Sequence, residues 1–205
     1  MINENWAYVA AVINVVGTIT YVVDMFGGRA RPNRVTWGVL SIAPIIAFAS
    51  MLSQGVSLAQ SIVTFSVGFS PLIIFVASFF VKYPAWQIKR FDIGCGLLSI
   101  VGLLLWWLTG DGNVAIVFSI LADGLAFLPT LVKSYFHPET ESPWTFFASE
   151  IATVLGLFTI TKWNFEHFGF QAYIFVSNLL AILLIYFKLG LVLSPPKGPK
   201  IGRVR

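Results

Sequence analysis

Polar side chains interrupt four long apolar stretches of the sequence, and these side chains are the candidates for chemistry. Asn14, Asp123, Glu150 and Asn178 each lie near the middle of such a stretch. A charged side chain at the centre of a bilayer costs about 2.5–3.5 kcal/mol on insertion scales, so a residue of this kind marks a candidate functional site. Counting along a helix at about 1.5 Å per residue places all four at a similar depth, with Glu150 slightly off-centre. We expect them to bind one small polar solute.

The two carboxyl groups of this set indicate a mechanism. A carboxyl group in hydrocarbon resists ionisation and can take up a proton near neutral pH, and two neighbouring carboxyl groups can share one proton. Our hypothesis is proton-coupled transport, with Asp123 as the main titrating group and Glu150 as its partner. The alternative is a carboxyl group that stays protonated and donates a hydrogen bond to a helix backbone.

The elements that position these residues follow from the composition. Apolar residues make up 57% of the 205 residues and charged residues only 11%, whereas a soluble domain carries about a quarter charged residues. A helix needs about 20 apolar residues to cross a bilayer, and seven stretches meet this requirement. The predicted fold class is therefore all-α, a polytopic membrane protein with seven transmembrane helices. The predicted spans are 5–26, 34–54, 59–82, 92–108, 113–135, 143–163 and 168–189.

The positions of the basic residues predict the orientation of these spans. With alternating spans, the loops at 27–34, 83–91 and 136–142 share one side with the C-terminal tail, and that side holds 12 of the 13 Lys and Arg residues. Only Lys162 falls on the other side. Because Lys and Arg in short loops are retained in the cytoplasm, we expect the N-terminus outside and the C-terminus in the cytoplasm of a plasma or inner membrane. The net charge of +4 is explained by this bias, and no nucleic-acid partner is expected.

Tryptophan positions give a second map of the same boundaries, because indole rings prefer the headgroup layer. We expect a cytoplasmic belt and an outer belt, with no tryptophan at the middle of the membrane. The cytoplasmic belt would hold Trp37, Trp86 and Trp144, and the outer belt Trp6, Trp106, Trp107 and Trp163.

An internal repeat organises the seven spans. Sliding the chain by about 107 residues places Gly17 on Gly124 and Trp37 on Trp144. This offset predicts a 3+1+3 parallel repeat, in which the fourth span is a linker that starts the second copy on the same side as the first. The predicted segments are a first repeat at 1–84, a linker helix at 85–111, a second repeat at 112–190 and a disordered basic tail at 191–205. Parallel repeats bind their solute between the copies near the midplane, so one chain can form a translocation unit; a homo-oligomer is left open.

Two motifs are similar to those of a known family. The segment 128–134, with Pro129 followed by Thr130, looks like the Pro-Gln motif of the PQ-loop superfamily with Thr in place of Gln. The segment 41–52 around Pro44 is similar to the second span of the SWEET transporters of that superfamily. The chain departs from the SWEET set of four prolines at Val22 and Ile151. The resemblance implies a seven-helix transporter of small solutes such as sugars.

The resemblance also implies roles for individual residues. An asparagine of the seventh SWEET span lines the sugar site, and Asn178 lies at the matching depth, with Ser66 as the counterpart on the third span. Prolines inside spans permit kinks that can act as hinges, and Pro44, Pro71 and Pro129 are candidates. Asp24, near the cytoplasmic end of the first span, is expected either to pair with an arginine of the adjacent loop or to act as a cytoplasmic gate.

Other functions are weighed against transport of a sugar or amino acid. A non-transporting receptor of the KDEL-receptor type and a vitamin or nucleoside carrier share the same architecture and stay open as alternatives. No enzyme activity is expected, since Asp24 and Asp123 differ in depth by roughly half a membrane, at about 1.5 Å per residue, which argues against an aspartyl hydrolase. His137 and His167 lie in loops on opposite sides, so no metal site is expected, and no cofactor is predicted. The expected partners are the lipid bilayer, a small polar solute and protons.

Overall fold

The structure is a computed structural model of the 205-residue chain. It describes residues 3, 5–42, 44, 45, 48, 58–83, 85–108, 112–160, 163 and 165–193. Throughout these residues the regular structure is helical, without a strand, which confirms the predicted all-α fold class.

The helices follow the order of the predicted spans. They are α1 (Trp6–Phe26), α2 (Arg34–Leu40), α4 (Leu58–Ala77), α5 (Arg90–Leu108), α6 (Gly112–Phe136), the short 3-10 helix η1 (Pro138–Thr140), α7 (Trp144–Thr159), α8 (Phe165–Ile185) and α9 (Leu189–Leu193). Among the described residues, α1 and the part of α8 from Phe168 to Ile185 are long and apolar enough to cross a membrane. The apolar helices Ser61–Ala77 and Trp144–Thr159 are shorter. Most of the predicted second span beyond α2 lies outside the described residues.

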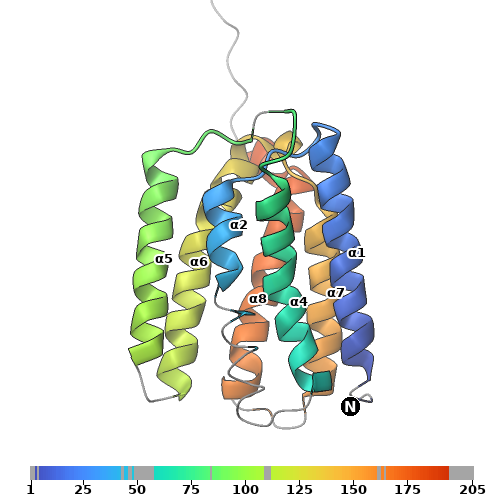
Figure 1. Cartoon of the computed structure of the whole chain (residues 1–205), viewed down its shortest axis with the longest axis vertical. Helices are drawn as coiled ribbons and strands as arrows, with labels where there is room; N and C mark the ends of the chain where they lie inside the picture. The colour runs from blue at the N-terminus through green and yellow to red at the C-terminus, as the bar shows by residue number, and fades with distance from the viewer. Residues whose placement is uncertain are drawn as a thin grey trace, which may run out of the picture.

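The helices run side by side along one axis of the molecule (Figure 1). Helix α5 lies at one edge and packs on α6, while α1 lies at the opposite edge and packs on α7; α4 and α8 lie between them. The end of the bundle at which α1, α4, α6 and α8 finish is called the basic end, because every described Lys and Arg is found there. These residues are Arg29, Arg31, Arg34, Lys82, Lys89, Arg90, Lys133 and Lys188.

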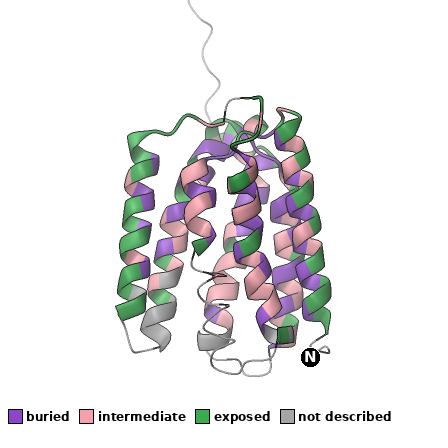
Figure 2. Ribbon diagram, in the orientation of Figure 1, coloured by how far each residue is buried: buried purple, intermediate pink, exposed green. Residues whose placement is uncertain are grey.

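The outward faces of the helices are apolar. On α1, the residues Val12, Val16, Ile19 and Val23 recur at helical spacing and are 54–62% exposed. The inward face of the same helix holds small and polar residues, among them Asn14. Figure 2 shows the same division of exposed and buried faces on α5. The bundle thus has an apolar exterior around an apolar core that also contains polar residues, whereas the outer face of a soluble helical bundle is polar.

A glycine allows α1 and α7 to approach closely. A Cβ at Gly17 would overlap the Cβ of Ala148 and would lie 3.0 Å from the backbone oxygen of Trp144. Small residues at a helix contact let the two backbones pack tightly. This contact joins the predicted first repeat to the predicted second one.

The ends of three helices, α4, α7 and α8, differ from the predicted spans by four or five residues. Helix α7 ends at Thr159 rather than at residue 163. Helix α4 ends at Ala77 rather than at residue 82, because Arg34 Nη2 donates to the backbone oxygen of Ser78 at 2.7 Å and Arg34 Nε donates to its hydroxyl at 3.1 Å. Helix α8 ends at Ile185, and the chain restarts as α9 after Lys188, which has a φ of 53°. The predicted disordered tail therefore starts too early, because residues 191–193 are helical, and the rest of the tail lies outside the described residues.

Candidate functional site

A cavity of ≈ 70 Å³ lies between the helices in the middle of the bundle. It has room for several water molecules but is smaller than the ligand pockets of about 300–1,000 Å³ in other proteins. Side chains of α1, α2, α4, α6, α7 and α8 line it, and no described residue of α5 does. The lining residues are Asn14, Trp37, Leu40, Val67, Ser70, Pro71, Asp123, Phe127, Thr145, Phe146, Ser149, Ile174, Ser177 and Asn178.

Two hydrogen bonds connect the first and third helices of the predicted repeats at this depth. Asn14 Nδ2 on α1 donates to Ser66 Oγ on α4 at 3.3 Å. Tyr173 Oη on α8 donates to Asp123 Oδ2 on α6 at 2.9 Å. Both bonds join polar groups in the middle of otherwise apolar helices. Each predicted repeat thus has one hydrogen bond between its own first and third helices.

A third hydrogen bond joins α8 to α7. Asn178 Nδ2 donates to Ser149 Oγ at 3.0 Å, and both residues line the cavity. The structure thus brings Asn14, Asp123 and Asn178 to one cavity, with Ser66 directly behind Asn14. Sequence reasoning missed Ser149 and Tyr173. Their helical spacing was the available signal, since Ser149 is one turn from Thr145, and Tyr173 is one turn from Ser177.

Glu150 lies outside this cavity lining. It is half-buried on α7 and directly follows Ser149, and consecutive residues of a helix point about 100° apart because a turn takes about 3.6 residues. The hydrogen-bond partner that the structure assigns to Asp123 is Tyr173. A side-chain hydrogen bond links Glu150 to Asn178, which does line the cavity, so Glu150 lies next to the site. That Glu150 shares a proton with Asp123 stays a prediction.

The three candidate hinge prolines are all buried, at different places. Pro71 lies inside α4 and lines the central cavity. Pro129 lies inside α6 and lines a second pocket at the basic end. Pro44 packs against α4: a Cβ added at Gly68 of that helix would lie 3.0 Å from the Cβ of Pro44. Only Pro71 is therefore placed to change the shape of the central cavity directly.

Aromatic rings close the cavity toward the basic end. The ring centroids of Trp37 and Phe146 are 6.1 Å apart, and those of Phe146 and Phe127 are 5.7 Å apart. Trp37 also packs edge-on against Tyr21 at 5.1 Å. Trp37 lies in the first turn of α2, at the basic end, but it is only 4% exposed, so its ring packs inside the bundle and does not face outward.

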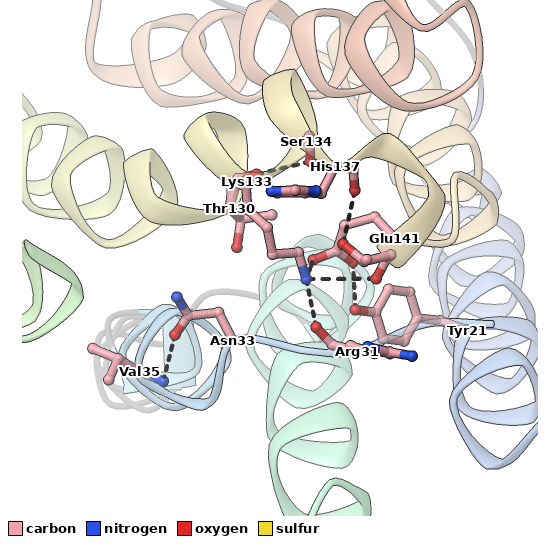
Figure 3. Close-up of polar contacts among 10 residues, drawn as sticks. Tyr21, Arg31, Asn33, Val35, Thr130, Lys133, Ser134, His137 and Glu141 are labelled. Carbon is pink, nitrogen blue, oxygen red and sulfur yellow. Dashed lines mark hydrogen bonds and ion pairs between the residues drawn. The ribbon is translucent and has the colours of Figure 1, made fainter. Parts of the chain in front are cut away.

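A buried ion pair lies beyond these rings. Lys133 Nζ at the end of α6 is 2.5 Å from Glu141 Oε1, and the side chains are 1% and 0% exposed. Tyr21 Oη on α1 donates to Glu141 Oε2 at 2.5 Å, and Lys133 Nζ donates to the backbone oxygen of Arg31 (Figure 3). The Glu141 carboxylate and the Lys133 ammonium group, both from the predicted second repeat, thus bind each other and also contact Tyr21 and Arg31 of the predicted first repeat.

Asp24 extends this arrangement. Its carboxylate accepts from Arg29 Nη2 at 2.7 Å and from the hydroxyl of Ser142 at 2.6 Å. The backbone N–H of Arg31 donates to the backbone oxygen of Thr140 at 2.8 Å. Asp24 therefore pairs with a loop arginine, which is the first of the two roles expected for it, and also contacts the predicted second repeat. A role as a cytoplasmic gate stays a prediction. The basic-end network is defined as Tyr21, Asp24, Arg29, Arg31, Lys133, Thr140, Glu141 and Ser142.

No family model matches the chain, and no curated protein or solved structure matches it. The resemblance to the PQ-loop superfamily stays a prediction from the motifs. The functional proposal is therefore based on the geometry of the cavity and of the basic-end network.

Proposed function

We propose that the chain is a seven-span membrane transporter for a small polar solute and that the central cavity is its solute site. The observation that carries this proposal is the lining of the cavity, to which helices of both predicted repeats contribute and α5 does not among the described residues. A site between parallel repeats is the arrangement expected of such a transporter. The N-terminus would lie outside, and the basic end would face the cytoplasm.

The exterior of the bundle supports the membrane location. Exposed large apolar side chains cover the outer faces of α1, α5 and α8, and soluble proteins rarely expose contiguous apolar surface on this scale. The concentration of Lys and Arg at one end fits the retention of basic loops in the cytoplasm. Both features agree with a multi-pass protein of a plasma or inner membrane.

The conformation described is closed toward the basic end. Trp37, Phe127 and Phe146 separate the cavity from the basic-end network, and the network links the two predicted repeats. A sugar or an amino acid needs more room than ≈ 70 Å³, so solute binding requires the repeats to move apart. Alternating access would then involve opening the basic-end network after solute has entered from the other side.

The single carboxyl group among the described lining residues favours a role for protons. Asp123 faces the cavity and accepts a hydrogen bond from Tyr173. In an apolar cavity, binding a proton removes the cost of keeping a carboxylate there, so proton binding can favour one conformation over another. We therefore propose that Asp123 carries the coupling proton.

A second solute class is favoured by the aromatic side of the cavity. Trp37, Phe127 and Phe146 line it together with the polar residues, and flat aromatic rings of a solute stack on such side chains. A vitamin or nucleoside would use both surfaces, whereas a sugar would use mainly the hydrogen-bonding groups of Asn14 and Asn178. A peptide receptor of the KDEL-receptor type would bind without moving its ligand across the membrane.

Uptake by proteoliposomes tests the proposal. The purified chain is reconstituted, and uptake of sugars, amino acids, nucleosides and vitamins is measured with and without a pH gradient. We expect uptake of one class, accelerated by the gradient in the wild type and independent of it in Asp123→Asn. The matched control is Glu139→Gln, the same change at a side chain 63% exposed and outside the cavity, which should behave as wild type.

Two results would overturn these proposals. Ligand binding without uptake of any solute would favour the receptor. Uptake by Asp123→Asn that still depends on the pH gradient would refute the role of Asp123 in coupling.

A further inference from the structure

A second pocket, of ≈ 290 Å³, lies at the basic end between the start of α5 and the end of α6. Trp86, Lys89 and Phe91 line it from the α5 side, and Val132, Phe136 and His137 from the α6 side. It is separate from the central cavity, and the proposed transport step does not use it. We call it the α5–α6 pocket.

Its polar part carries a positive charge that no described acidic side chain neutralises by an ion pair. Lys89 is exposed, and its Nζ lies 5.5 Å from the centroid of the Trp86 ring. Asp92 also lines the pocket, but this residue is 3% exposed, and its Oδ2 accepts from the backbone N–H of Lys89 at 2.8 Å, which caps the start of α5. Lys133 lies over the same Trp86 ring at 5.2 Å, but its charge is paired with Glu141.

A hydrogen-bonding group stands beside this charge. The His137 ring packs against Trp86 with centroids 5.6 Å apart, and its side chain is 53% exposed. Lys89 and His137 therefore both lie close to one indole ring that lines the pocket. A phosphate oxygen is a suitable acceptor for the Lys89 ammonium group and for His137, whose Nδ1 also lies 3.5 Å from Oε1 of the exposed Glu139 side chain.

The remaining wall is apolar and open to the outside of the bundle. Phe91 is 48% exposed and Phe136 61% exposed, although both line the pocket. Further along α5, exposed side chains such as Leu98 and Val101 continue the apolar surface away from the basic end. A ligand that fits both parts has an anionic head and a long apolar tail.

We propose that the α5–α6 pocket binds an anionic phospholipid of the cytoplasmic leaflet, with its phosphate at Lys89 and His137 and an acyl chain along Phe91 and Phe136. Basic pockets between spans on this side of a membrane suit such headgroups. A free phosphate would use only the polar part and leave the apolar wall uncovered. The inference rests on the membrane location in the proposed function, but not on transport.

Lipid titration of the full-length protein tests this site. The unfolding temperature is measured in neutral detergent against phosphatidylglycerol, phosphatidylcholine and glycerol 3-phosphate. Phosphatidylglycerol should raise it in a saturable way, and the other two should not. In Lys89→Glu the half-saturating concentration of phosphatidylglycerol should rise about tenfold, from the loss of one attractive charge and the gain of a repulsive one.

Two further variants make the result specific. Lys82→Glu places the same charge change at an exposed position of the basic end outside the pocket and should leave the half-saturating concentration unchanged. Lys89→Gln, which removes the charge without adding the opposite one, should give an intermediate shift and serves if Lys89→Glu folds poorly.

Equal phosphatidylglycerol titrations of wild type and both Lys89 variants would overturn the inference. Equal stabilisation by glycerol 3-phosphate would also overturn it, because the ligand would then be a soluble anion. Proteoliposome uptake separates this inference from the proposed function. Uptake without a lipid effect refutes only the lipid site, and a lipid effect without uptake of any solute refutes only transport.

Discussion

The basic-end network and the central cavity are both polar clusters inside an apolar bundle, but their polar groups are satisfied to different degrees. In the network, the Lys133 ammonium group is paired with Glu141, which also accepts from Tyr21. In the cavity, the hydroxyl oxygen of Ser70 is buried and has no hydrogen-bond partner among the described residues. Asn14 and Asn178 each donate one side-chain hydrogen bond to a serine there.

This difference separates a structural role from a binding role. A buried polar group without a partner costs about 1–3 kcal/mol, and a solute that supplies the partner recovers that cost. A network whose buried charges are paired with each other has little to offer a solute, but it holds its elements in one arrangement. The network therefore acts as the closed end of the bundle, and the cavity acts as the site.

The largest loss of stability is expected when the buried ion pair between Lys133 and Glu141 is broken. Lys133→Met leaves the Glu141 carboxylate buried without its counter-charge and should destabilise the protein by about 3–5 kcal/mol. Chemical unfolding in detergent, followed by tryptophan fluorescence, measures this loss.

The matched control removes both charges. Lys133→Met combined with Glu141→Leu replaces the pair by apolar groups and should recover most of the stability, since a buried pair contributes little net energy. A cost below about 1 kcal/mol for Lys133→Met alone would place the pair among ordinary surface ion pairs and remove the structural role of the network.

A smaller loss of stability is expected from a substitution at the contact between α1 and α7, where the two predicted repeats meet. Gly17→Ala forces α1 away from Ala148 on α7 and should cost about 1–3 kcal/mol, the usual range for overpacking. Gly94→Ala on α5 is the control, because a Cβ there meets no atom within 4 Å. The same unfolding assay should show that Gly94→Ala is neutral or slightly stabilising. Equal losses in the two variants would argue against a close α1–α7 contact.

The sequence predicts much of the fold because long apolar stretches specify helices locally. The ranges of α1, α5 and α6 agree with the predicted spans to within two residues at each end. Depth along a helix is also a local property, which is why Asn14, Asp123 and Asn178 meet at one level.

Contacts between distant segments leave no comparable signal. The hydrogen bond between Tyr21 and Glu141 joins residues 120 positions apart, and neither residue interrupts an apolar stretch at mid-depth. The direction of a side chain around its helix depends on how the helices pack, so the sequence predicts the depth of Ser149 and Glu150 but not that Ser149 is the one of the two that lines the cavity. The preference of tryptophan for the headgroup layer predicts the position of Trp37 along the bundle axis, but not that its ring packs inward against Tyr21 and Phe146.

The smallest loss of stability is expected in the cavity, together with a large loss of function. Asn178→Ala removes the hydrogen bond to Ser149, and such bonds between membrane helices are worth about 0.6 kcal/mol. The control is Thr153→Ala on α7, which removes a hydroxyl that donates to the backbone oxygen of Ser149 in its own helix and lies outside the cavity lining.

Solute uptake by proteoliposomes of Asn178→Ala tests the central claim most directly, with wild type and Thr153→Ala in parallel. The account predicts uptake lowered at least about tenfold in Asn178→Ala, the loss expected when a buried hydrogen bond to the solute is removed, and close to wild type in Thr153→Ala. Wild-type uptake by Asn178→Ala would contradict the claim that the cavity between the repeats is the solute site.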